Sequence, residues 1–134
     1  MKIEGGCYCG EVRYESNGDP MMQAQCHCRE CQYITGGQPN MIVAVPKAEF
    51  SFTKGEPASF ARSDLDNPVS RMFCKTCGTA LGTESPAMPT AMIIKVGTMD
   101  DPSFYSPQIA IFTKDRLSFH HVADGVAAFD TVPG

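Results

Sequence analysis

The chain has 134 residues, of which 43% are hydrophobic and 19% charged, with a formal net charge of −4 and no Trp. This length predicts a single domain over residues 1–134, with a core built from Phe, Met, Val and Ile. The 11 Lys and Arg residues form no basic block, which argues against a nucleic-acid partner. No apolar run approaches the roughly 20 residues that span a bilayer, and residues 1–6 do not resemble a signal peptide. We therefore expect no membrane contact and a cytoplasmic location.

Short apolar or alternating runs, broken by Gly, Pro, Asn and Asp, predict an all-β fold class. We expect strands at residues 12–16, 22–26, 41–45, 50–53, 58–62, 71–73, 79–83, 91–96 and 108–112. Residues 17–20 and 66–68 predict turns, and residues 54–57 predict a hairpin between the strands that flank them.

Residues 28–35 predict the one short helix, because they contain helix formers, no Pro, and a stop at Gly36-Gly37. A helix this short needs an anchor. A metal ion held by Cys28 and Cys31 would provide that anchor.

The seven cysteines are an odd number, so they cannot all pair as disulfides. They fall into three groups, each with metal-ligand spacing: Cys7-x-Cys9, Cys26-x-Cys28-x-x-Cys31 and Cys74-x-x-Cys77. Clustered cysteines in a reducing compartment indicate metal binding, and zinc is a metal that thiolates hold well. Gly78, which follows the third group, permits the positive φ that such loops often need, and Gly10 fits the bent backbone that a Cys-x-Cys chelate requires.

Seven thiolates divide most simply into four and three. Cys7, Cys9, Cys74 and Cys77 would form a closed structural zinc site that joins segments about 65 residues apart. Cys26, Cys28 and Cys31 would hold a second zinc with one position open, which is typical of catalytic sites. The alternative is a second structural site whose fourth ligand comes from elsewhere in the chain, the candidates being His27, His120 and His121.

Charged residues near these groups extend the hypothesis. Lys75 and Arg29 either offset the negative charge of the thiolates or face water, and Arg29 would orient the carboxylates of a thiol such as glutathione. Glu30 and His27 are the local candidates for a general acid or base. Three thiolates leave zinc with a net charge of −1, which favours activation of a thiol over polarisation of a carbonyl.

Four motifs carry a match that extends over nearly the whole chain: Cys7-Tyr8-Cys9-Gly10-Glu11-Val12-Arg13-Tyr14, Cys26–Cys31 with Gly36, Arg71–Leu81, and Gly97–Pro102. Through them the chain resembles the glutathione-dependent formaldehyde-activating enzyme family, which is similar to centromere protein V. It departs from the family in being shorter than the founding type of enzyme and in having Phe119 where the family usually has a Trp.

The resemblance implies a small zinc-bound β-sheet domain similar to the fold of the mammalian suppressor of sec four. It also implies two zinc ions per chain, a structural one at the first and third groups and a catalytic one at Cys26, Cys28 and Cys31. The implied activity is that of a carbon–sulfur lyase, with glutathione and formaldehyde combining to S-hydroxymethylglutathione. Two alternatives are a thiol-dependent lyase for another small electrophile and a non-catalytic zinc module that binds a partner protein.

Overall fold

Two β-sheets form the framework in the computed structural model, which describes residues 1–133. The small sheet has the order β1-β2-β5, formed by Ile3–Gly6, Arg13–Ser16 and Phe50–Lys54. The large sheet has the order β11-β10-β3-β4-β9-β8-β7-β6. Its strands in chain order are β3 (Met22–Cys26), β4 (Asn40–Pro46), β6 (Ala58–Phe60), β7 (Ser70–Phe73), β8 (Ala80–Glu84), β9 (Ala91–Lys95), β10 (Ile109–Ile111) and β11 (Ala127–Ala128).

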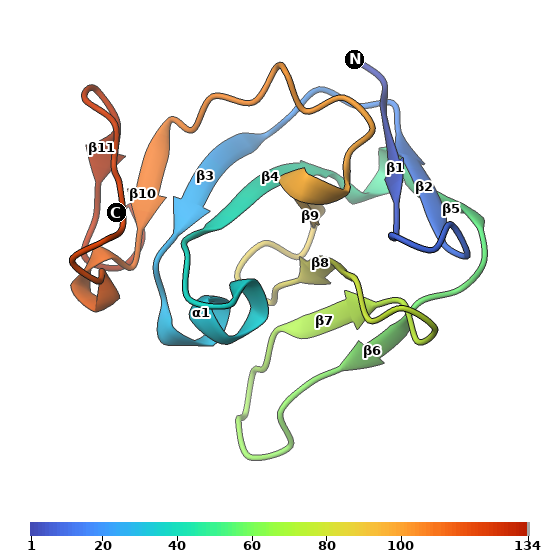
Figure 1. The fold of residues 1–134 in the computed structure, drawn as a ribbon, viewed down its shortest axis with the longest axis horizontal. Helices are drawn as coiled ribbons and strands as arrows, with labels where there is room; N and C mark the ends of the chain where they lie inside the picture. Colours follow the sequence, from blue (N-terminus) through green and yellow to red (C-terminus); the bar gives the residue numbers. More distant parts are fainter. Residues whose placement is uncertain (134) are drawn as a thin grey trace.

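Figure 1 shows the small sheet at the opposite end of the molecule from β10 and β11. The one α-helix among residues 1–133, α1 (Arg29–Thr35), lies between β3 and β4 in the chain, and single 3₁₀ turns occur at Lys47–Glu49, Val96–Thr98 and Thr113–Asp115. Neighbouring strands are antiparallel except at β10, which runs parallel to both β3 and β11. This pairing sets Ile111 opposite Cys26 and so brings the C-terminal part of the chain to the middle cysteine group.

The mostly β prediction with one short helix is confirmed. All nine predicted strands form, with ends shifted by at most two residues. Two strands were missed: β1 contains two glycines in four residues, which lowers its β propensity, and β11 is only two residues long. The predicted hairpin at residues 54–57 is wrong, because β5 pairs with β2 while β6 pairs with β7, so this turn carries the chain from one sheet to the other.

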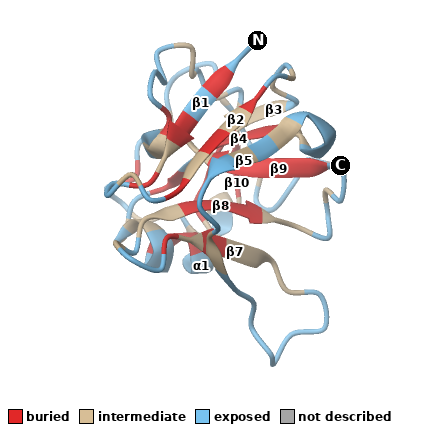
Figure 2. Ribbon diagram, turned by 90° about the vertical axis from the view of Figure 1, so that its right-hand side faces the viewer, coloured by how far each residue is buried: buried red, intermediate tan, exposed pale blue. Residues whose placement is uncertain are grey.

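The core divides into two clusters because successive residues of β4 and β9 point to opposite faces of the large sheet. On one face, the residues from these strands are Val43, Val45, Met92 and Ile94, which pack with Ile3 and Tyr14 of the small sheet. On the other face, they are Ile42, Ala44, Ala91 and Ile93. Figure 2 shows how burial concentrates on β4, β8 and β9.

The first and third cysteine groups contribute to one core cluster and the middle group to the other. Cys7 and Cys74 belong to the cluster between the two sheets, and Cys26 and Cys31 belong to the cluster on the opposite face. The expected Val, Ile and Met are buried in the core, where Ala, Cys, Leu81 and Tyr14 join them. The expected Phe contributes only from the periphery: Phe50, Phe52 and Phe104 pack against the core while partly exposed. No helix within the described residues is long and apolar enough to cross a membrane.

Candidate metal centres and the cavity beside one of them

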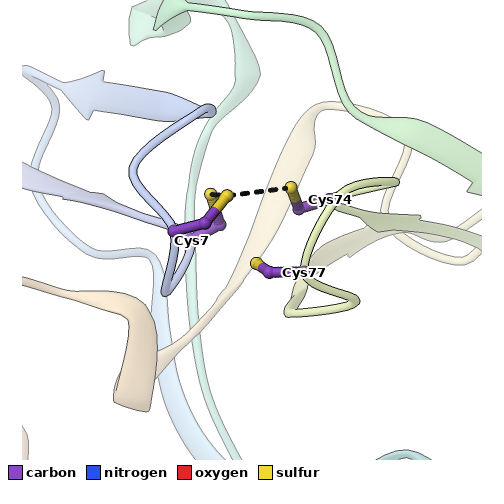
Figure 3. Close-up of side chains that lie close together, drawn as sticks. Cys7, Cys74 and Cys77 are labelled. Carbon is purple, nitrogen blue, oxygen red and sulfur yellow. Dashed lines mark hydrogen bonds between the residues drawn. The ribbon is translucent and has the colours of Figure 1, made fainter.

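The first and third cysteine groups meet in space. Cys7 and Cys9 lie at the turn between β1 and β2, and Cys74 and Cys77 at the turn between β7 and β8. The four sulfur atoms lie within 4.8 Å of one another, with 3.6 Å between Cys7 and Cys9 and 3.7 Å between Cys9 and Cys74. Figure 3 shows Cys7, Cys74 and Cys77 directed into one space from two separate loops. We call this group the four-cysteine cluster.

The two loops share one backbone design. Gly10 has φ +82° and donates its N–H to the carbonyl of Cys7, while Gly78 has φ +80° and donates its N–H to the carbonyl of Cys74. The predictions of a positive φ at Gly78 and of a bend at Gly10 are confirmed. Each loop therefore turns its two sulfur atoms to the same side, as a shared metal ion requires.

Thr79 joins the two loops, a role that sequence reasoning missed although the residue lies in the Arg71–Leu81 motif. Its hydroxyl accepts a hydrogen bond from the N–H of Tyr8 at 3.1 Å and lies 3.2 Å from the sulfur of Cys77. Hydrogen bonds with the side chain and backbone of Thr79 lower the pKa of Cys77 to about 5. Thr79 thus favours the thiolate, the form of cysteine that binds metal.

The middle group, here the three-cysteine cluster, is local in sequence. Cys26 ends β3, and the sulfur of Cys28 caps α1 by accepting a hydrogen bond from the N–H of Cys31 at 3.2 Å. The helix stops at Gly36 in the left-handed conformation, as predicted. The three sulfur atoms lie within 4.8 Å of one another.

Crowding of three thiols makes their pKa values diverge. Hydrogen bonds from Cys26 and Cys28 lower the pKa of Cys31 to about 3. Hydrogen bonds with Cys28 and Cys31, together with burial, raise the pKa of Cys26, and the pKa of Cys28 is also raised. The cluster therefore holds one thiolate readily but needs a bound cation for all three thiols to ionise together.

Asn40 and Lys95 support the three-cysteine cluster from behind, and sequence reasoning missed both. The side-chain amide of Asn40 donates through Nδ2 to the sulfur of Cys31 at 3.5 Å and accepts at Oδ1 a hydrogen bond from the ammonium of Lys95 at 2.6 Å. Burial lowers the pKa of Lys95 to about 8, against the attraction of Cys31. Among the described residues no carboxylate pairs with this ammonium, so its charge is free to offset thiolate charge.

A cavity of about 490 Å³ borders Cys26, Cys28 and Cys31 and none of the other four cysteines. Its polar lining consists of Glu30, Asn40, Arg71, Thr83 and Ser85. Arg71 lies 3.5 Å from the carboxylate of Glu30. The sequence pointed to Glu30 but noted Arg71 only as part of a motif.

Arg29 and Lys75 do not border this cavity. Arg29 is exposed, hydrogen-bonds to Gln32 and lies 5.3 Å from the centre of the Tyr33 ring, and Lys75 is also exposed. Of these three cationic residues, Arg71 is the one that borders the cavity.

The histidines near the three-cysteine cluster form a separate buried chain. The side-chain amide of Gln25 donates both to the carbonyl of His121 and to Nε2 of His27. Because Nε2 of His27 accepts a hydrogen bond, the proton of this ring lies on Nδ1. That Nδ1–H donates to Nδ1 of His120 at 2.9 Å. Nε2 of His120 then donates to the carbonyl of Gly37 at 2.7 Å. With their ring nitrogens occupied, His27 and His120 dock the C-terminal segment onto the loop of the cluster.

Within residues 1–133, neither these histidines nor any other Cys, His, Asp or Glu joins the three sulfur atoms as a fourth ligand.

The donor sets fit a thiophilic metal ion. Four thiolates at about 2.3 Å from a tetrahedral zinc lie about 3.8 Å from one another, close to the 3.6 and 3.7 Å in the four-cysteine cluster. All seven cysteines are free thiols. Fold and clusters together define a small β-sheet protein, with one short helix, that could hold two metal ions.

Comparison with known proteins extends this definition. The family model described as glutathione-dependent formaldehyde-activating enzyme matches residues 2–115, and the chain belongs to this family. A crystal structure of a Rhodobacter sphaeroides protein is similar, with a TM-score of 0.59 and 16% sequence identity over 72% of this chain and 87% of that chain. At this identity the likeness shows the fold alone. No curated protein matches the chain.

Proposed function

We propose that this protein is a zinc-dependent carbon–sulfur lyase, cytoplasmic and formed by one domain over residues 1–134, that joins glutathione or a similar thiol to formaldehyde or another small electrophile. The observation that carries the proposal is the cavity beside Cys26, Cys28 and Cys31, in a chain whose family is described by this activity. We also propose that the sheets follow the arrangement of the mammalian suppressor of sec four.

The two clusters take different roles in this proposal. Cys7, Cys9, Cys74 and Cys77 hold a structural zinc, and Cys26, Cys28 and Cys31 hold the catalytic one. A zinc ion with three thiolate ligands supplies an open position for a thiol and favours its deprotonated form. The lack of a fourth Cys, His, Asp or Glu at the three-cysteine cluster, among the described residues, supports this division.

The surrounding side chains manage charge and protons. The ammonium of Lys95 offsets part of the negative charge of the three thiolates, because it is hydrogen-bonded to Asn40, which in turn donates to Cys31. Glu30 borders the cavity and is our candidate to take the proton of the thiol and return it to the oxygen of the electrophile. Arg71, whose side chain is only 17% exposed, presents its guanidinium to a carboxylate of the thiol.

Metal content and adduct formation test the proposal. Freshly purified, reduced protein should contain two zinc ions per chain. It should also form the glutathione–formaldehyde adduct faster than the uncatalysed reaction does, as measured by NMR exchange spectroscopy. Cys28→Ser should retain one zinc and lose the acceleration, and Lys75→Gln, an exposed change beside the other cluster, should match the parent protein. A folded, reduced protein without zinc would contradict the proposal.

A second candidate function rests on one specific observation. An exposed apolar hollow beside α1 and β6 is bordered by Tyr33, Ile34 and Phe60. Such a surface is what a non-catalytic zinc module needs in order to bind a partner protein. Two zinc ions without acceleration for any thiol–aldehyde pair would favour this candidate. Exposure of a few aromatic side chains is common, so the cavity beside the cysteines carries more weight.

A further inference from the structure

The walls of the cavity differ sharply in chemistry. Glu30 and Arg71 are the only charged side chains among its described lining residues, and they share one side. The strands β3, β4, β9 and β10 and the segment after β10 supply an apolar wall that includes Met22, Ile42, Ile93, Ile109, Ile111 and Phe112. A charged tripeptide thiol would lose hydration against this wall without gaining partners, so the wall suits the other reactant.

Size gives the same answer. Formaldehyde has two heavy atoms and fills little more than the volume of one water molecule, about 30 Å³ in the liquid. The cavity of about 490 Å³ falls in the range of sites that bind small organic molecules of many atoms. The thiol takes up part of this space on the side of Glu30 and Arg71, and a one-carbon aldehyde beside it leaves the apolar wall uncovered.

Phe112 adds a second, independent observation. It has φ +53° and ψ +39°, and among the described residues it is the only one other than glycine with positive φ. A bulky aromatic side chain is disfavoured there, where Asn or Gly would be accommodated more easily. The backbone is held by hydrogen bonds to Thr131 and Asp115, and the side chain borders the cavity. Strained residues of this kind collect at functional sites.

We infer that the electrophile of this site is an aldehyde with an apolar chain or ring of several carbons, whose hydrocarbon part packs against Phe112 and the β10 wall. The inference rests on the proposed function. The thiol sulfur bonds to the carbonyl carbon, the π bond of the carbonyl breaks, and the oxygen takes the proton that the thiol has lost. The product is a hemithioacetal, formed without an oxidant or reductant.

The first test is a chain-length series on the zinc-loaded protein, with formaldehyde, ethanal, butanal, hexanal and benzaldehyde. With glutathione, kcat/KM should rise up to about fourfold per added methylene until the cavity is full, the fold-change that corresponds to 0.8 kcal/mol per buried methylene. A rate that is flat or falls from formaldehyde upward would overturn the inference and leave the proposed function standing.

A variant pair locates the effect. Phe112→Asn removes the ring while easing the backbone, so it should fold like the parent and flatten the chain-length series. Phe60→Asn changes an exposed phenylalanine away from this cavity and should leave the series intact. An equally steep series in Phe112→Asn would contradict the role of this residue.

Binding of unreactive alcohols separates the inference from the reaction. In NMR titrations, hexan-1-ol should bind at least tenfold more tightly than methanol to the parent protein and lose most of that advantage in Phe112→Asn. This result without turnover of any aldehyde would support the apolar subsite and reject the proposed reaction. Equal binding of both alcohols would overturn the inference, whatever the activity.

Discussion

The four-cysteine and three-cysteine clusters use the same donor atoms in opposite settings. The first lies between the two sheets and joins loops from distant parts of the chain; the second comes from one short segment on the other face of the large sheet and opens to a cavity. The comparison teaches that the surroundings of a thiolate cluster, and not the identity of its ligands, indicate whether it can meet a substrate. Each of the following predictions tests that contrast.

The largest expected effect is the loss of a ligand between the sheets. Cys74 is 1% exposed and belongs to the core, so Cys74→Ser should prevent folding, because a structural zinc contributes about 10 kcal/mol or more, comparable to the whole stability of a domain. Cys31→Ser should keep most of the fold. Soluble yield and thermal melts compare the two variants. Equal collapse of both would show that the three-cysteine cluster is structural as well.

A smaller loss is expected where the C-terminal segment docks on the three-cysteine cluster. His120→Leu leaves the Nδ1–H of His27 buried without an acceptor and removes the hydrogen bond to Gly37, which should cost about 2 to 3 kcal/mol of unfolding free energy in urea titrations. His121→Leu is the matched control, since that side chain is exposed and only its backbone carbonyl is bound. An unchanged midpoint for His120→Leu would show that this segment is not held by the histidine pair.

Lys95→Met should separate stability from metal retention. Burial of the ammonium is unfavourable to the fold, so in metal-free protein the methionine variant should be more stable by about 1 kcal/mol at pH 7. Because the pKa of Lys95 is about 8 in the folded protein, below its usual 10.5, the unfolded chain binds more protons between these values. The free energy of unfolding of the parent protein therefore rises as the pH increases from about 8 to 10.5, and the stability advantage of the methionine variant disappears. Urea titrations at pH 7, 9 and 10.5 measure this difference.

The same variant should release metal from the three-cysteine cluster several-fold faster to a chromogenic chelator, because the thiolates lose their nearby cation. Release from the four-cysteine cluster should not change. Equal acceleration at both clusters would show that Lys95 acts on the whole fold rather than on one site.

The smallest effect is expected at the surface. Arg13 and Asp100 form an ion pair that ties β2 to the turn after β9, and it lowers the pKa of Asp100. The carboxylate is about half exposed, so Asp100→Asn should cost less than 1 kcal/mol and leave both clusters loaded. The stabilisation is present above the usual pKa of Asp and disappears as the pH falls through the lowered value. Loss of either metal in this variant would contradict the independence of the clusters from that turn.

Sequence reasoning was most accurate where the signal is local. The helix, its glycine stop and the left-handed loop glycines follow from neighbouring residues, and counting seven thiols gave the four-and-three grouping that the structure brings together. Asn40 and Lys95 could not be found this way, because they reach Cys31 through pairing of β3, β4 and β9. Asn40 stands opposite Cys26 in that register, one residue before the predicted start of its strand. The wrong hairpin had the same origin: turn residues mark a change of direction but not which sheet follows.

The spacing of the two clusters along the chain also sets an order of events during synthesis. Cys77, which completes the four-cysteine set, is the 46th residue after Cys31. At about 5 to 20 residues per second, the ribosome needs roughly 2 to 9 seconds to make that stretch. A nascent chain thus offers its three-cysteine segment to a thiophilic cation first, and the site between the sheets can be filled only after the turn that follows β7 has emerged. Where the metal is scarce, the direction of translation gives the three-cysteine segment the earlier opportunity to bind.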